Sequence, residues 1–182
     1  MLTNFKVLEH MKNFSSVGKF IPVLALSFLI NSAHAAKVIN YSLETEPPQL
    51  NSTKATDTES GFILGHVMEG LTRNGKDGKI EPGVAEKWEI NDQGATFYLR
   101  KNAKWSDGKP VTAKDFIFSW KLTLDPKNAS EYAFILYPIK NAEAINTKKA
   151  SADTLGATAP DDYTVKIVFE KPCGYFLGLS AF

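Results

Sequence analysis

The sequence has few of the residues on which most catalytic and metal sites depend. Its 182 residues include one cysteine and three histidines. A single cysteine cannot form an internal disulfide, and we interpret Cys173, beside Pro172, as a half-buried small hydrophobic residue, with a catalytic thiol as the alternative. His10 and His34 lie in the N-terminal segment, and His66 is the remaining histidine. The motifs HExxH and GxSxG, paired CxxC and a glycine-rich phosphate loop are missing. We therefore expect no catalytic residues, no metal site and no cofactor.

The sequence also lacks an excess of charge of either sign. It contains 21 lysines and arginines and 20 aspartates and glutamates, for a formal net charge of +1. Proteins that bind nucleic acid or anionic lipid need a basic surface to neutralise phosphates. We therefore expect no nucleic-acid partner.

A long apolar run is absent as well, and the one near the N-terminus is short. Residues 20–30 (FIPVLALSFLI) follow three lysines and precede the small-residue tripeptide at 33–35. A transmembrane helix needs about 20 apolar residues. The tripartite pattern predicts a secretory signal cleaved after Ala35, with an N-terminal membrane anchor as the alternative. Because no cysteine near Ala35 offers a lipid attachment point, we expect a protein that is not membrane-embedded, in a Gram-negative periplasm.

Secondary-structure signals alternate along the rest of the chain without a strict βαβ repeat. Apolar residues at every second position predict half-buried strands, and apolar residues at helical spacing predict helices. Thr112 and Asp115 approximate a capping box at the start of one helix, which Asp125-Pro126 ends. The order predicts an α+β fold, a mixed sheet with flanking helices. We expect strands at residues 38–43, 87–90, 95–100, 155–158 and 163–169, and helices at residues 60–71, 112–124 and 141–149.

Two further apolar features concern the tryptophans and the end of the chain. We interpret Trp88, Trp105 and Trp120 as core residues, with stacking on sugars as the alternative. Residues 175–182 are apolar and have neither a polar tail nor a helix stop. We expect this segment to be an unpaired apolar end, with possible aggregation near Phe176 and Phe182.

Residues 69–120 resemble the bacterial extracellular solute-binding proteins of family 5, which serve peptide and nickel ABC importers. The matching pieces are EGL at 69–71, PGVAEKW at 82–88, FYLRKNAKWSDG at 97–108 and TAKDF at 112–116. Each piece is weak alone, and their order and spacing together are specific. Asp125-Pro126 and the residues at 130–133 resemble the oligopeptide and murein-peptide branch.

The resemblance implies a bilobal periplasmic binding protein of the peptide-binding, three-domain type, of which this chain is an N-terminal fragment. On this basis residues 1–35 are a signal peptide, residues 36–68 start the first lobe, and residues 69–182 form a nearly complete small extra domain. The remainder of the first lobe and the second lobe would be missing. We expect such a fragment to bind peptides weakly or not at all, because a ligand is held between two lobes.

The resemblance further implies that oligopeptides bind in an extended conformation, by pairing with protein main chain. Thr56, Asp57 and Thr58 match the pairing segment, and Tyr132 matches an aromatic residue of the cleft wall. An ordinary surface loop and simple domain packing are the alternatives for these positions. The implied partners are a peptide ligand and ABC importer permease subunits, and we expect a monomer. Murein peptide, dipeptide, haem or a nickel chelate are alternative cargoes, and a secreted hydrolase is the alternative class.

Overall fold

The computed structural model describes residues 40–181. The chain divides into two units, residues 1–42 and residues 43–182, and residues 40–42 carry no helix or strand. The predicted signal peptide and its cleavage site after Ala35 lie outside the described residues. Within residues 40–181, no helix is long and apolar enough to cross a membrane. The fold below is that of the second unit alone.

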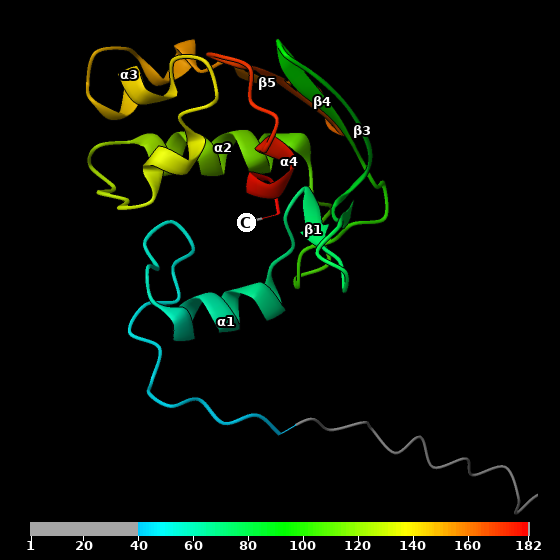
Figure 1. The fold of residues 1–182 in the computed structure, drawn as a ribbon, viewed down its shortest axis with the longest axis vertical. Coiled ribbons are helices and arrows are strands. Elements are labelled where there is room, and N and C mark those ends of the chain that lie inside the picture. The colour runs from blue at the N-terminus through cyan, green and yellow to red at the C-terminus, as the bar shows by residue number, and fades with distance from the viewer. Residues whose placement is uncertain (1–39, 182) are drawn as a thin grey trace, which may run out of the picture. The chain divides into compact units, whose positions relative to one another are not determined.

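A four-stranded sheet is the centre of this unit, with the strand order β3-β4-β6-β5 (Figure 1). Every described pairing within it is antiparallel. A separate two-stranded sheet precedes it along the chain. The strands are β1 (Thr72–Asn74), β2 (Ile80–Pro82), β3 (Ala85–Asn91), β4 (Gly94–Leu99), β5 (Ala157–Asp161) and β6 (Thr164–Val168).

Alternation of side chains explains why the two middle strands hold the core. In β4, Ala95, Phe97 and Leu99 are buried, and in β6, Val165 and Ile167 are buried. Their intervening residues lie on the other face, as a period of two requires. The strands predicted at 87–90, 95–100 and 163–169 are confirmed as β3, β4 and β6. Their pairing, which brings β6 beside β4 from a distant part of the sequence, gives an antiparallel sheet with one buried face.

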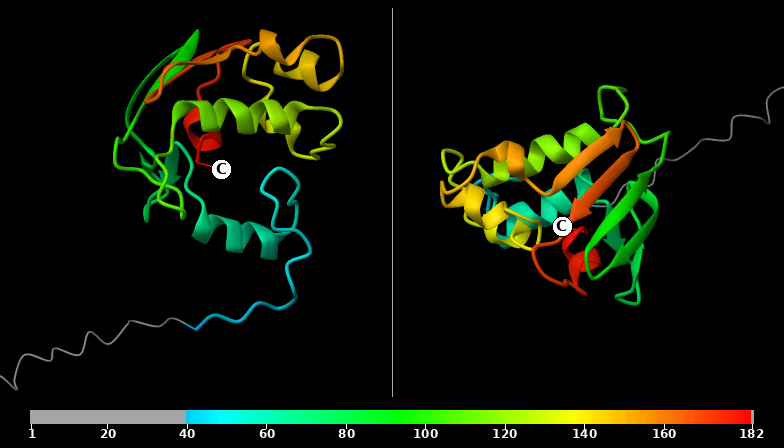
Figure 2. Two further views of the ribbon diagram at one scale, coloured as in Figure 1. Left: turned by 180° about the vertical axis from the view of Figure 1, so that it is seen from behind. Right: turned by 90° about the horizontal axis from the view of Figure 1, so that it is seen from above.

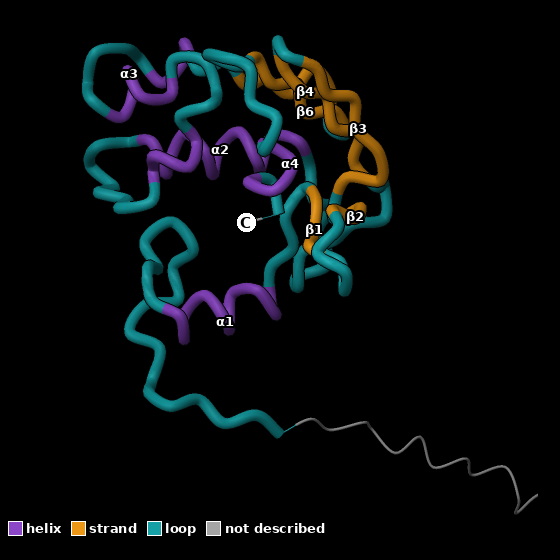
Figure 3. The backbone as a smooth tube through the Cα atoms, in the orientation of Figure 1, coloured by secondary structure: helices purple, strands orange, loops and turns teal. Residues whose placement is uncertain are grey.

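Helices α2, α3 and α4 lie on one side of this sheet, whereas α1 lies apart from it, as Figures 1 and 2 show. The longest is α2, which packs against β5 and β6 and begins where the Ala113 amide donates to the Asp162 carbonyl at 2.8 Å. The predicted capping residues are confirmed, because the Asp115 carboxylate accepts from the Thr112 amide at 2.7 Å. Figure 3 shows that α3 and α4 are much shorter than α1 and α2. The set comprises α1 (Thr58–Val67), α2 (Ala113–Leu124), α3 (Ala142–Asn146), α4 (Phe176–Leu179) and the 3₁₀ turns η1 (Ala133–Leu136) and η2 (Ala152–Thr154).

The C-terminal segment packs into the core, which corrects the expectation of an unpaired apolar end. Phe176 is 2% exposed, and its ring centroid lies 4.9 Å from that of Phe169 and 6.4 Å from that of Phe97. The Thr72 hydroxyl donates to the Leu177 carbonyl at 2.7 Å. Aromatic burial and this bond tie the segment to β1, so aggregation through Phe176 is not expected. Phe182 lies outside the described residues.

Other predictions were wrong in their boundaries or their burial. The helix expected at 60–71 ends at Val67, and Leu71 lies instead in the core, where its carbonyl accepts from the Ala85 amide at 2.9 Å. Residues 40–43 form no strand, because no described strand lies beside them to complete a ladder. Trp88 and Trp120 pack against the core as expected, whereas Trp105 is 45% exposed in a turn.

Candidate ligand-binding site

Residues 56–58, which we call the candidate segment, contain the cap of α1. Asp57 is this cap and sets the geometry of the segment. Its backbone is extended, with φ −97° and ψ 160°, and its Oδ1 accepts from the Ser60 amide at 2.7 Å. This backbone hydrogen bond, with a further bond from the Ser60 side chain, lowers the pKa of Asp57. Ser60 itself is fully buried, and its hydroxyl accepts from the Gln49 amide at 3.3 Å. The cap therefore fixes where the extended chain ends and the helix begins.

A tight turn precedes this cap and is closed by its own polar groups. The Asn51 side chain accepts from the Thr53 amide at 3.0 Å and from the Thr53 hydroxyl at 2.9 Å. The Asn51 carbonyl accepts from the amides of Lys54 and Ala55, both at 2.9 Å. Such side-chain bonds to the nearby backbone stabilise turns without helix or sheet. The chain then emerges into Thr56 with a defined direction.

Two side chains from the loop after α2 bond to this part of the chain, one to Thr53 in the turn and one to Thr56 in the candidate segment. The Asn128 amide nitrogen Nδ2 donates to the Thr53 hydroxyl at 3.0 Å. The Tyr132 hydroxyl donates to the Thr56 carbonyl at 3.4 Å, a long hydrogen bond. The structure thus brings Tyr132 together with the segment at 56–58, although 76 positions separate Tyr132 from Thr56 in the sequence.

Sequence reasoning missed Asn128, whose only signal was its place in the same loop as Tyr132, just after Asp125-Pro126. An asparagine after such a turn is usually assigned to the turn itself. Here the backbone amide of Asn128 does bond to the Asp125 carbonyl at 2.9 Å, while its side chain reaches Thr53. One residue therefore both closes its own loop and holds the turn that precedes residues 56–58.

Two backbone amides of the candidate segment have no hydrogen-bond acceptor among the described residues. Among the described residues, no hydrogen bond is donated by the backbone amide of Thr56 or Thr58 to another described group. Both residues are exposed. Asp57 between them is extended, whereas Thr58 begins α1, whose first amides have no partner within the helix. Amides that are free beside an extended residue can pair with another chain. The segment therefore has the chemistry needed to pair with another extended chain.

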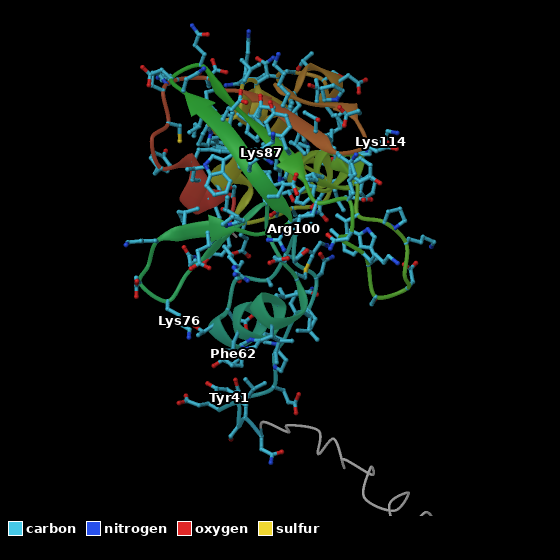
Figure 4. All side chains as sticks on the ribbon, turned by 90° about the vertical axis from the view of Figure 1, so that its right-hand side faces the viewer. Tyr41, Phe62, Lys76, Lys87, Arg100 and Lys114 are labelled. Carbon is cyan, nitrogen blue, oxygen red and sulfur yellow. The ribbon has the colours of Figure 1, made fainter. Side chains whose placement is uncertain are left out.

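Two open concavities lie elsewhere on residues 43–181. One, of about 550 Å³, lies between α2 and α3 and is lined by Phe118, Leu122 and Ile145 among others. The other, of about 470 Å³, lies over β3 and β4, where Lys87 projects from the outer face (Figure 4). Neither concavity is lined by Thr56, Asp57, Thr58 or Tyr132.

Side chains within the second concavity interact with one another. The Lys87 ammonium lies 4.6 Å from the centroid of the Tyr98 ring, and the Tyr98 hydroxyl donates to Glu89 Oε1 at 3.1 Å. This hydrogen bond to a carboxylate raises the pKa of Tyr98. These contacts stabilise the polar outer face of the edge strand β3. Their geometry is not that of a catalytic acid–base pair.

Side chains that could bind a metal or act as nucleophiles do not cluster among the described residues. No group of three or more histidines, cysteines, aspartates and glutamates comes together within residues 40–181. His66 is exposed on α1, where its Nδ1 lies 2.7 Å from the Phe62 carbonyl. Cys173 is buried in the core, more deeply than the half-buried position that we predicted.

Comparison with known proteins connects these features to one family. The sequence profile of the bacterial extracellular solute-binding proteins, family 5 Middle, matches residues 79–182. The oligopeptide-binding protein OppA of Bacillus subtilis is 45% identical over 146 residues, which are 79% of this chain and 27% of that protein. The periplasmic murein peptide-binding protein MppA of Escherichia coli is 44% identical over 142 residues, 76% of this chain and 26% of that protein.

A solved structure agrees with this assignment. The substrate-binding domain of an oligopeptide ABC transporter from Bacillus anthracis superposes with a TM-score of 0.76 at 47% identity, covering 78% of this chain and 28% of that chain. This chain thus spans about a quarter of the length of the relatives that it matches. The resemblance and the α+β fold expected from the sequence are confirmed. The chain belongs to the bacterial extracellular solute-binding proteins of family 5.

Proposed function

We propose that this chain is part of the periplasmic substrate-binding component of an ABC importer, which binds oligopeptides in an extended conformation and delivers them to the membrane permease. The observation that carries the proposal is the pair of backbone amides of Thr56 and Thr58, which flank the extended residue Asp57, donate to no other described group and lie in a segment bonded to Tyr132. The names of the relatives, which include oligopeptide- and murein peptide-binding proteins, support a peptide as the ligand.

Pairing with main chain suits a carrier that must accept many peptides. Every peptide presents the same amides and carbonyls, so strand addition gives affinity without reading side chains. In this proposal Thr56 and Thr58 supply amides to the peptide, and Asp57, extended and capping α1, sets the direction of the chain between them. Tyr132 forms part of the wall of the cleft. No bond of the ligand is made or broken, and the protein is not an enzyme.

The proposal carries the domain arrangement implied by the family. Residues 1–35 are a signal peptide, residues 36–68 start the first lobe, and residues 69–182 form most of a small extra domain. The opposing lobe would come from further chain, and the complete protein would act as a monomer with the permease subunits. Closure of two lobes over the peptide would supply the burial that an open segment lacks.

Proline at position 58 tests main-chain pairing directly. Thr58 is the first residue of α1, where proline is well tolerated, and Asp57 already has the extended backbone that precedes proline. Thr58→Pro therefore removes one amide donor while it preserves the helix. We expect peptide affinity, measured by titration calorimetry on the complete mature protein as its gene encodes it, to fall about ten- to a hundredfold.

Thr58→Ala is the matched control, because it shortens the side chain and keeps the amide. We expect its affinity to stay within about twofold of the starting protein. Equal affinities for Thr58→Pro and Thr58→Ala would contradict pairing through this amide. Binding of haem, a nickel chelate or a sugar by the complete protein, without any peptide binding, would overturn the ligand assignment.

A further inference from the structure

Two neighbouring aromatic side chains project from the turn η1, beside the candidate segment. Tyr132 is 38% exposed and Phe134 is 55% exposed. Their ring centroids lie 5.8 Å apart at an interplanar angle of 85°, an edge-to-face arrangement. Aromatic rings favour this geometry, because the positive edge of one ring meets the negative face of the other. We call these two residues the aromatic pair.

The backbone between the two rings is anchored in the core. Ala133, which separates them, is 2% exposed, and Ile139 beyond the turn is fully buried. The Tyr132 carbonyl accepts from the Ile135 amide, and the Phe134 carbonyl accepts from the Tyr137 amide, both at 3.1 Å. The buried Ala133 side chain turns its two neighbours outward. A turn anchored in the core thus holds the pair exposed to solvent, although exposed apolar area is unfavourable in water.

The position of the pair connects it with the proposed peptide site. The Tyr132 hydroxyl bonds to the Thr56 carbonyl, in the segment where the peptide backbone would lie. In an extended peptide, successive side chains point to opposite sides of the backbone. A peptide paired with residues 56–58 would therefore direct one of its side chains toward the wall that contains Tyr132.

We propose that the aromatic pair is a subsite for one apolar side chain of the bound peptide, with Phe134 as the residue that determines preference. The inference rests on the proposed function and adds a preference to it. Main-chain pairing is blind to sequence, whereas a fixed aromatic face favours an aromatic or large aliphatic side chain. Phe134 donates no hydrogen bond through its side chain, so its contribution to binding is apolar contact alone.

A panel of tripeptides tests this subsite on the complete mature protein as its gene encodes it. Tri-alanine is compared by calorimetry with tripeptides that carry one phenylalanine, or one lysine, at each position in turn. We expect the best phenylalanine peptide to bind about tenfold more tightly than tri-alanine. Phe134→Ala should reduce this ratio about three- to tenfold, and Phe134→Tyr should restore it.

Phe118→Ala is the matched control, because Phe118 is 68% exposed on α2 and lines a different concavity. Its ratio should equal that of the starting protein. An equal loss for all peptides in Phe134→Ala would show a structural role and overturn the inference. So would a preference for lysine, to which the neighbouring Glu131 carboxylate is suited. If no peptide binds at all, the proposed function itself fails, and the subsite fails with it.

Discussion

The two regions that meet at the candidate site are stabilised by different interactions. The sheet region (residues 71–181) is fixed by burial, with Phe97, Val165 and Leu124 fully inaccessible. The entry segment (residues 49–68) buries two polar residues, Thr53 and Ser60, while Val67 at its end is 72% exposed. Helix α1 buries Ser60 alone. One region is thus stabilised by apolar area, and the other by caps, turns and a few side-chain bonds.

Under the proposed function, the difference suggests where the ligand contacts would lie. Segments with few buried apolar contacts open more readily than core strands, and binding elements are drawn from that less stable class. In this chain, Tyr132 belongs to the sheet region, and its hydrogen-bond acceptor Thr56 belongs to the entry segment. The proposed peptide would therefore lie between a residue anchored next to the core and a segment with few buried apolar contacts.

The largest expected effect comes from emptying the core of the sheet region. Phe97 is fully buried, with ring contacts to Trp88 and Phe176. Phe97→Ala should lower the free energy of unfolding by about 3–5 kcal/mol, through lost burial and a residual cavity. Val67→Ala, in the entry segment, should change it by less than about 0.5 kcal/mol. Urea unfolding followed by tryptophan fluorescence measures both, and similar losses would erase the contrast between the regions.

Sequence patterns predicted the sheet region well because its signals are local. The alternation in β4 and β6 reports one buried face, and the spacing of Thr112 and Asp115 reports a helix start. Long-range pairing needed the structure. The contact of Phe176 with Phe169 depends on the return of the chain under the sheet, and an apolar tail carries no sign of that return.

The candidate site was only partly readable from the sequence. Thr56, Asp57, Thr58 and Tyr132 came from family resemblance, because a polar stretch without periodicity predicts only a loop. The contact between Tyr132 and Thr56 and the bond from Asn128 to Thr53 depend on a loop fold that hydrophobic patterns do not encode. Helix α1 was predicted too long, since Leu71 continued its apolar spacing while its burial is determined by the core next to β3.

Two asparagines offer a middle-sized test of the contrast. Asn128 donates to Thr53 in the entry segment, whereas Asn146 donates to the Leu124 carbonyl at 3.1 Å within the sheet region. Asn128→Ala should speed hydrogen exchange of the Thr53 and Ala55 amides about two- to tenfold and leave global unfolding unchanged, because one hydrogen bond contributes about 1 kcal/mol.

Asn146→Ala is the counterpart, and it should lower the global free energy of unfolding by about 1–2 kcal/mol. It also removes the acceptor of the Tyr137 hydroxyl, which bonds to Asn146 Oδ1 at 2.9 Å. In this variant, the difference between the opening free energy of the entry-segment amides and the free energy of global unfolding should stay as in the starting protein. If Asn128→Ala instead lowered global stability as much as Asn146→Ala, the two regions would unfold as one cooperative unit.

The smallest effect concerns acid. The Ser60 amide lowers the pKa of Asp57 in the folded state, so the cap stabilises the fold above the ordinary aspartate pKa. That contribution is lost as the pH falls from about 4 through the lowered pKa. Asp57→Asn keeps a capping oxygen without a titrating proton. The Ser60 amide shift, followed by NMR, should titrate below about pH 3.9 in the starting protein and stay flat in Asp57→Asn. A midpoint at or above the ordinary aspartate value would mean that the cap bond at 2.7 Å does not persist in solution.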